Sequence, residues 1–238
     1  MCSDCNLRTK WRSFSFCFFC SDIKLDVEAA EELIQGAWPN LKHIKLQWNK
    51  VGLDVISVLV RAQWPQLQSL DLGHNWLLAD SIAVLVMAPW PNITMLVLNN
   101  NDLDEAAIKC LSESQWPCLT SLYLNNCTLE GVELELLPRA KWPLLSMLSL
   151  LGNCIDAVGA LHLVQADWPL LTELDLMDNA LDGLAVRYLA ENNWPLLKTL
   201  DLTVNEELEL SMVSLLRPEQ QAVTHIDPSS HKYVPYMS

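Results

Sequence analysis

The hydrophobic and polar positions of this 238-residue chain repeat with a period of 26 residues. The dipeptide Trp-Pro marks each period, and counting its Trp as position 1 puts leucine or isoleucine at positions 4, 7 and 9 in all seven copies. Positions 6, 8 and 10 vary. A constant period of this kind predicts an array of one supersecondary unit, in which each copy buries its apolar face against its neighbours. The seven repeats begin at Trp38, Trp64, Trp90, Trp116, Trp142, Trp168 and Trp194.

Each repeat is predicted to contain a short strand followed by a short helix. The alternation of apolar positions 7 and 9 with variable positions is typical of a strand that buries one face. Position 22 is leucine in every repeat, and residues such as Ile56 and Val186 lie three positions earlier, on the same side of a helix. Proline disfavours helical geometry in the residue before it, so we expect Trp to end the helix. The seven indoles are then expected to stack as one column of the core.

Position 12 is asparagine in six repeats and Cys127 in the fourth. A column of amides can satisfy backbone groups where the chain leaves the strand ladder. The pattern L-x-x-L-x-L-x-x-N/C-x-L is complete at Leu119–Leu129 and Leu171–Leu181, and it resembles the leucine-rich repeat signature.

That resemblance covers about residues 38–219 and is closest to the ribonuclease-inhibitor-like and cysteine-containing classes of repeat. It implies an α/β leucine-rich repeat solenoid, or horseshoe, with a parallel β-sheet on the concave face and short helices on the convex face. It also implies a protein that mainly binds other proteins. Two features depart from those classes: the Trp-Pro dipeptide is not a general signature of them, and Glu207 replaces an expected leucine.

The two ends of the array are predicted to be caps, because terminal repeats are commonly atypical. Residues 1–37 are interpreted as a degenerate N-terminal repeat whose strand is the aromatic run Phe14–Cys20 and whose helix is Ala29–Ile34. Residues 38–219 contain the seven regular repeats. Residues 220–238 are predicted to form one capping strand, with Ile226 on position 7, that ends at Pro228, and a mobile tail from His231 to Ser238.

Two other interpretations of the N-terminus stay open. Basic residues precede the aromatic run as in a secretory signal, although no small-residue cleavage site follows. Four thiolates are also a sufficient ligand set for zinc, although the two pairs are closer together than in the usual ribbon. These thiolates would come from Cys2, Cys5, Cys17 and Cys20.

The formal charge of −14, from 29 acidic and 15 basic residues, disfavours nucleic acid and anionic membrane surfaces. It favours a basic or apolar protein partner. No apolar run approaches the ~18–20 residues of a membrane span. Cysteines scattered over unrelated repeat positions indicate a reducing compartment, so we expect a cytoplasmic monomer. Two glycosylation sequons, at Asn92 and Asn126, would matter only in a secreted protein.

The chain contains no Gly-rich phosphate loop, His-Glu-x-x-His or Gly-x-Ser-x-Gly motif, and its five histidines are scattered. We therefore expect a protein that is not an enzyme and has no cofactor. Trp48 and Trp76 lie off the tryptophan column, where they are either interface aromatics or packing within turns.

The variable positions 6, 8 and 10 predict an acidic interaction scaffold whose concave face binds a partner protein. The alternatives are an adaptor subunit of an enzyme complex, such as a ubiquitin ligase with an N-terminal zinc site, and a secreted or cell-surface recognition module. The candidate partner-binding residues are Met95, Val97, Asn99, Tyr123, Asn125, Met147, Leu151, Asp175, Met177 and Asp201.

Overall fold

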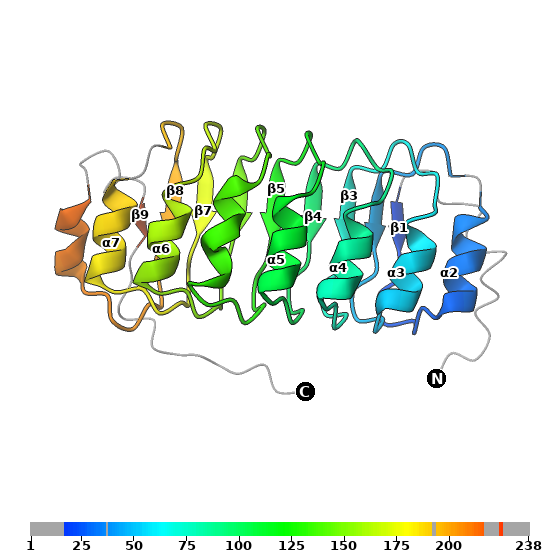
Figure 1. Cartoon of the computed structure of the whole chain (residues 1–238), viewed down its shortest axis with the longest axis horizontal. Helices are drawn as coiled ribbons and strands as arrows, with labels where there is room; N and C mark the ends of the chain where they lie inside the picture. Colours follow the sequence, from blue (N-terminus) through cyan, green and yellow to red (C-terminus); the bar gives the residue numbers. More distant parts are fainter. Residues whose placement is uncertain (1–16, 37, 192–193, 217–223, 226–238) are drawn as a thin grey trace.

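The computed structural model describes residues 17–36, 38–191, 194–216 and 224–225 (Figure 1). Within these residues the strands form one nine-stranded sheet, in which every strand runs parallel to the next and the spatial order follows the sequence. The strands are β1 (Cys17–Phe19), β2 (His43–Lys45), β3 (Ser69–Asp71), β4 (Met95–Val97), β5 (Ser121–Tyr123), β6 (Met147–Ser149), β7 (Glu173–Asp175), β8 (Thr199–Asp201) and β9 (Thr224–His225).

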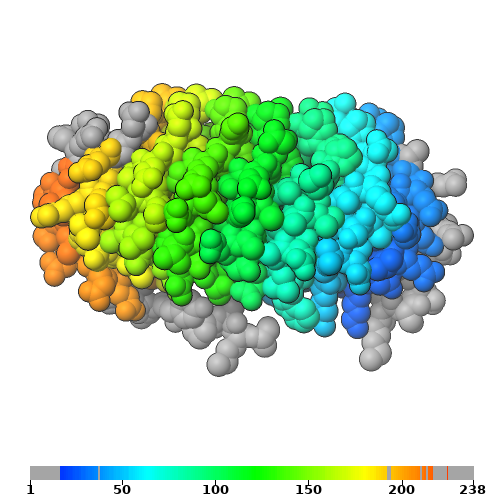
Figure 2. Space-filling view, in the orientation of Figure 1, coloured from blue at the N-terminus to red at the C-terminus, as the bar shows by residue number. Residues whose placement is uncertain are grey.

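The helices form a second layer that covers one face of the sheet, and each packs against the helices of the adjacent repeats. Figure 2 shows this face as a closed surface in which successive repeats follow one another as bands. The predicted two-layer α/β solenoid is therefore confirmed. The helices are α2 (Val27–Ile34), α3 (Leu53–Leu59), α4 (Ala79–Leu85), α5 (Glu105–Ser112), α6 (Ala157–Leu163) and α7 (Gly183–Ala190), with the 3₁₀ helices η2 (Glu133–Arg139) and η3 (Leu210–Leu215).

The apolar positions of the repeat build the core between the two layers. Every residue at positions 7 and 9 is buried, from Ile44 and Leu46 to Leu200 and Leu202. Several α-helices begin at an aspartate whose carboxylate accepts backbone N–H groups of the first turn, as Asp104 does from Ala107. Local sequence therefore sets where these helices begin, and burial of their apolar side holds them to the sheet.

Two repeats form 3₁₀ helices where the pattern predicted α-helices. In η2 the chain carries Pro138, which lacks the N–H group that an α-helix needs. In η3 the leucine at position 22, Leu215, is 38% exposed, and its neighbour Leu216 is buried instead. A 3₁₀ helix has three residues per turn, so the side chain that faces the core shifts along the sequence.

The Trp-Pro dipeptide does not end the helix, contrary to the sequence-based expectation. Helix α3 ends at Leu59, five residues before Trp64. The Trp64 carbonyl accepts the N–H of Leu67 at 3.1 Å, and the same bond recurs in all seven repeats. Trp-Pro-x-Leu is therefore a β-turn, with proline at the second position, where its fixed φ is favourable. Proline constrains its immediate neighbours and leaves the helix end one turn earlier unaffected.

The tryptophan column is core, as predicted. Six of its seven members are buried, and Trp38 is half-buried. Trp64 and Trp90 stack with their ring centroids 5.4 Å apart, and Trp168 and Trp194 stack at 6.5 Å. We call the side of the solenoid formed by positions 1–4 the tryptophan edge.

The opposite side, where positions 11–14 follow the strands, is the asparagine edge. Each position-12 asparagine in the described repeats is buried and bonds to the backbone of its own and the preceding repeat. Asn75 is typical: its Oδ1 accepts the N–H groups of Asn49 and Val51 at 2.9 and 3.1 Å, and its Nδ2 donates to the Leu46 and Leu72 carbonyls. The predicted role of the asparagine column is confirmed.

The described parts of the two ends continue the same sheet. In β1, Phe18 is buried opposite Ile44 of β2, and α2 buries Leu33. At the other end, β9 pairs with β8 so that Thr224 lies opposite Leu200. The 26-residue frame places Ile226 at that point, so the last strand is shifted by two residues; Ile226 and Pro228 lie outside the described residues.

Candidate functional site

The side chains at positions 6 and 8 project from the sheet face that carries no helix, which we call the open sheet face. Parallel pairing places equivalent positions side by side, so Val97, Tyr123, Ser149, Asp175 and Asp201 form one row across five strands. All ten predicted binding residues lie in these strands or two residues beyond them, and all are partly exposed. The structure therefore brings the predicted residues onto one surface.

The apolar members of this set do not form one uninterrupted patch. Ser121 lies between Met95 and Met147 in the position-6 row, and the buried Ser149 follows Tyr123 in the position-8 row. Met95, Val97 and Tyr123 form one central group. Leu151 and Met177 form a second group in the position-10 row, so polar side chains divide the predicted patch.

Hydrogen bonds within the protein occupy the polar members of the set. The Asn99 Oδ1 accepts the N–H of Asn125 at 2.9 Å, and the Asn125 Oδ1 accepts that of Leu151 at 3.1 Å. The Ser149 Oγ lies 2.6 Å from Asn125 Oδ1 and 2.8 Å from Asp175 Oδ2, and its single proton serves one of them at a time. These bonds hold the side chains in a fixed platform.

Aspartates at position 8 also bond to the backbone two residues later. The Asp175 Oδ1 accepts the N–H of Met177 at 3.1 Å, and the Asp201 Oδ1 accepts that of Thr203 at 2.9 Å. Asp201 and Asp175 therefore support the strand ends as well as giving the surface its charge. Periodicity alone did not reveal this second role.

Tyr123 is the aromatic residue of the central group. Burial raises the pKa of its phenol, and the charge of Glu173 adds to that effect. The hydroxyl group is therefore protonated at neutral pH and can donate a hydrogen bond to a partner.

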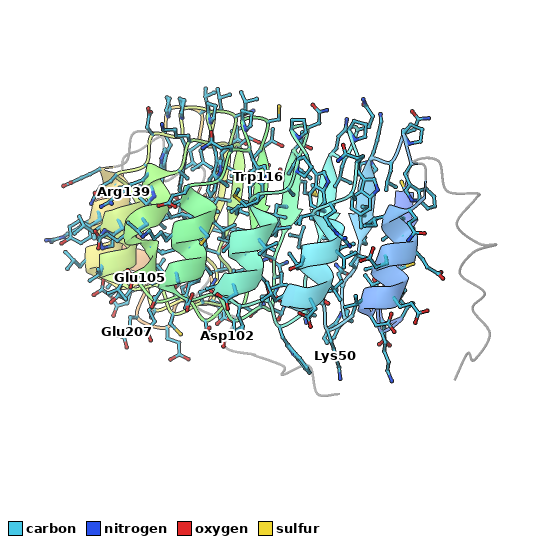
Figure 3. All side chains as sticks on the ribbon, turned by 45° about the vertical axis from the view of Figure 1, so that its right-hand side comes forward. Lys50, Asp102, Glu105, Trp116, Arg139 and Glu207 are labelled. Atoms are coloured by element: carbon cyan, nitrogen blue, oxygen red, sulfur yellow. The ribbon has the colours of Figure 1, made fainter. Side chains whose placement is uncertain are left out.

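Trp48 and Trp76 lie at the asparagine edge, beside the open sheet face, and are 55% and 67% exposed. In Figure 3 the labelled residues Lys50, Asp102 and Glu207 mark this edge, and Trp116 lies on the opposite side of the solenoid. The two rings are therefore exposed to solvent, which favours their interpretation as interface aromatics over packing within turns.

The exposed rings belong to a cluster of stacked and charged side chains. The Trp48 ring stacks on His74 with centroids 3.6 Å apart, and the Lys50 Nζ lies 5.1 Å from the centroid of Trp76. Together with Asp22 and Asn100 they line a cavity of about 450 Å³. We call these six residues the aromatic pocket. Sequence analysis missed four of them, although Trp48, His74 and Asn100 share position 11 of consecutive repeats and are thereby neighbours.

Burial shifts the pKa of two titratable groups, His74 in this pocket and Asp71 next to it. It raises the pKa of Asp71, an effect opposed mainly by the N–H of Gly73, and it lowers the pKa of His74, an effect opposed by the Asp71 charge. His74 is therefore neutral at physiological pH, so it presents an uncharged ring to Trp48.

The zinc hypothesis depends on Cys2 and Cys5, which lie outside the described residues. Cys17 occupies position 6 on the open sheet face, whereas Cys20 packs against the hydrophobic core, so these two side chains diverge. Within the described residues no three His, Cys, Asp or Glu side chains are grouped as metal ligands. Zinc binding stays a prediction.

None of the helices in residues 17–36, 38–191 and 194–216 has the length and apolar character needed to cross a bilayer.

Comparison with known proteins agrees with the repeat geometry. A family model described as Leucine Rich repeat matches residues 169–190, within the sixth repeat. The crystal structure of InlP from Listeria monocytogenes is similar over 88% of this chain, with a TM-score of 0.52 and 15% identity. The chain therefore has the leucine-rich repeat fold. No curated protein sequence matches it significantly.

Two other solved structures are similar at lower scores. A chain of the yeast Rad7 and Elc1 complex is 13% identical with a TM-score of 0.40, over 92% of this chain and 79% of that one. A chain of the mouse RP105/MD-1 complex is 18% identical with a TM-score of 0.43, over 79% of this chain and 39% of that one. The present chain spans 60% of the InlP chain that it matches.

Proposed function

We propose that this leucine-rich repeat protein is a non-enzymatic module that binds a partner protein on its open sheet face. The observation that carries the proposal is the central group of Met95, Val97 and Tyr123, which is partly exposed in the middle of a face that carries no helix. Methionine and tyrosine are enriched in protein interfaces, and an apolar centre surrounded by polar groups is the usual anatomy of such a surface.

The fixed polar platform around the group supports the same proposal. Side chains such as Asn125 and Asp175 are already held by internal hydrogen bonds, so binding would cost little conformational entropy. A rigid surface with a few apolar anchors is well suited to recognising one partner.

The proposal includes a monomer that acts without a cofactor in the cytoplasm. The thiols of Cys110, Cys118, Cys127 and Cys154 are unpaired in the structure, which supports a reducing compartment. Three histidines, His43, His74 and His162, belong to repeats 1, 2 and 5, and His225 lies in the last strand, which supports a role without catalysis.

The test is affinity capture from the native cell with three variants of the full chain. Val97→Glu and Tyr123→Ala alter the central group, and we expect each to reduce the captured partner at least about tenfold. Val132→Glu makes the same chemical change on the helical side, where Val132 is 61% exposed, and should leave capture unchanged.

Thermal unfolding of each variant separates loss of binding from loss of folding. All three melting temperatures should stay within about 3 °C of the wild type, because partly exposed substitutions typically cost little stability. Undiminished capture by a folded Val97→Glu variant would place the interface elsewhere.

A further inference from the structure

The charges on the open sheet face and the asparagine edge change sign from one end of the array to the other. At positions 6, 8, 10, 11 and 13, repeats 3 to 5 carry only one ionisable acidic or basic side chain, Asp102. The basic end comprises Lys24, His43, Lys45 and Lys50, with Asp22 and the buried Asp71 as its carboxylates, and the acidic end comprises Glu173, Asp175, Asp178, Asp201 and Glu206.

The aromatic pocket lies at the basic end. Lys45 Nζ lies 5.3 Å from the ring centroid of Phe19, and Lys50 Nζ lies 5.1 Å from that of Trp76, so each ammonium group is held over an exposed ring. The salt bridges of the described residues do not include either lysine. Lys50 is thus positioned and available for a carboxylate from outside the chain, whereas the charge of Lys45 also acts on the buried Asp71.

The turn itself does not explain why tryptophan occupies this place. Trp48 and Trp76 both have a φ of 61°, in the left-handed region that is costly for a bulky side chain. Position 11, which holds Trp48, has a positive φ in every repeat, and the others fill it with residues such as Asn100, Gly152 and Val204. Position 13, which holds Trp76, has a positive φ in only some repeats, among them Lys50 and Thr128. Exposed rings in a strained turn, lining a cavity, indicate a binding role.

The charges define what the pocket accepts. A cationic ligand would meet Lys50 beside the Trp76 ring, and a nucleic acid would be repelled by the net charge of −14. A cavity of about 450 Å³ lies within the usual range of pockets and has room for an aromatic or aliphatic side chain. Carboxylates next to that side chain would pair with Lys45 and Lys50.

We infer that an extended segment of the partner lies across the strands, with acidic residues and one apolar side chain at the aromatic pocket and basic residues at the acidic end. The inference rests on the proposed function, because it uses the same face. Strands are about 4.8 Å apart, so the five steps from β2 to β7 span roughly 24 Å. An extended chain rises about 3.3 Å per residue, so roughly seven residues bridge the two ends.

Fluorescein-labelled decapeptides test this order of charges by fluorescence anisotropy at low ionic strength. The probe EDEFGSGKRK has the acidic, aromatic and basic parts in the inferred order. The control KRKFGSGKRK is basic at both ends, and EDEAGSGKRK lacks the aromatic side chain. The general field of an acidic protein favours the all-basic control, so tighter binding of the probe requires local recognition.

We expect the full chain to bind the probe at least tenfold more tightly than the all-basic control and at least fivefold more tightly than the peptide without phenylalanine. Lys50→Glu and Trp76→Ala should each weaken probe binding at least fivefold. Lys141→Glu makes the same change of charge at the tryptophan edge, where Lys141 is exposed, and should leave binding unchanged.

Three results would overturn the inference: no binding of the probe, equal or tighter binding of the all-basic control, or equal weakening by Lys141→Glu and Lys50→Glu. Affinity capture of the partner with these variants distinguishes failure of this inference from failure of the proposed function. If Val97→Glu loses the partner while Lys50→Glu and Trp76→Ala retain it, the open sheet face binds a partner and the charge order is wrong. If all three retain it, both proposals fail.

Discussion

The two edges of the solenoid each carry one recurring side chain per repeat, but they use opposite physical chemistry. At the asparagine edge, Asn75 makes hydrogen bonds with both ends of its amide, and its partners lie in two repeats. At the tryptophan edge, the indole N–H groups of Trp64, Trp116 and Trp168 are buried without an acceptor in the described chain. The geometry of its hydrogen bonds determines the side chain at the asparagine edge, whereas side-chain volume determines it at the tryptophan edge.

This difference shows how a repeat array fixes its register. An amide with donors on one side and an acceptor on the other fits only one arrangement of the adjacent backbone. An indole fills space and tolerates a missing hydrogen bond, because its apolar area offsets the cost of the unpaired N–H group. The substitutions that follow separate the two contributions.

The largest effect should come from Trp116→Ala, in the middle of the tryptophan edge. Removing a buried aromatic side chain leaves a cavity, and we expect the free energy of unfolding to fall by about 3–5 kcal/mol, a large fraction of the stability of the array. Urea unfolding followed by circular dichroism measures the change. Trp76→Ala removes the same side chain at an exposed position and should cost under about 1 kcal/mol. Equal losses of unfolding free energy in the two variants would show that Trp116 does not contribute to the core.

Asn179→Ala should cost somewhat less, about 2–4 kcal/mol, because it leaves buried backbone groups without partners. The Ile155 N–H loses its acceptor at 3.0 Å, and the Leu150 and Leu176 carbonyls lose a donor. Hydrogen exchange should show the loss of protection spreading into the preceding repeat, where Ile155 lies. A loss confined to the sixth repeat would contradict the bridging role of the amide.

The paired variants Trp90→Phe and Trp116→Phe isolate the indole hydrogen bond. Both lose the same ring area, but only Trp90 donates to a protein carbonyl, that of Ala62 at 3.1 Å. We expect Trp90→Phe to be the more destabilising by about 1 kcal/mol in urea unfolding. The reverse order would show that the N–H of Trp116 has a partner in solution.

Cys127→Asn should stabilise the protein by about 1 kcal/mol, because it completes the asparagine edge in the fourth repeat. The thiol is a weak donor, and its Sγ lies 3.3 and 3.5 Å from the Leu98 and Asn125 carbonyl oxygens. An amide there can accept the N–H groups of the third repeat, as in the other repeats. Burial raises the pKa of this thiol to about 11, so slow alkylation of Cys127 in the folded wild type at pH 8 checks its environment.

The smallest effect concerns the pH dependence that Asp71 contributes on the open sheet face. Burial raises the pKa of this carboxyl in the folded chain, so the folded state binds the proton more tightly than the unfolded state. The free energy of unfolding therefore falls as pH rises from the ordinary aspartate value through the raised one. The Asp71→Asn variant has no carboxyl to titrate at this position. The free energy of unfolding of the variant relative to that of the wild type should therefore rise as the pH increases between the ordinary and the raised pKa of the aspartate. Parallel pH profiles of the two proteins would show that Asp71 titrates normally.

The period made the strands and the asparagine column predictable, because a buried side chain and a bonded amide recur at the same place. The position of the Trp-Pro turn was not predictable in this way. Proline fixes its own φ and restricts the preceding residue, and the four-residue link between Leu59 and Trp64 has no marker in the sequence.

The open sheet face was predicted only as a set of positions. Alternation says which side chains face outward, but hydrogen bonds such as that from Ser149 to its neighbours depend on which residues meet across strands. The aromatic pocket depends in the same way on Trp48 and His74 sharing position 11 in consecutive repeats. That contact is predictable from the amino-acid sequence when the seven repeats are aligned as rows, because residues in one column lie side by side.

The bridging asparagines also limit how such a gene can change in length. Each asparagine amide accepts hydrogen bonds from backbone N–H groups of the preceding repeat. A duplication or deletion therefore preserves this row of hydrogen bonds when it adds or removes a whole 26-residue unit. Each added unit would insert one strand and move the basic and acidic ends of the open sheet face about 4.8 Å further apart. Under the inferred mode of binding, the number of repeats therefore determines the length of the partner segment that the array can bind.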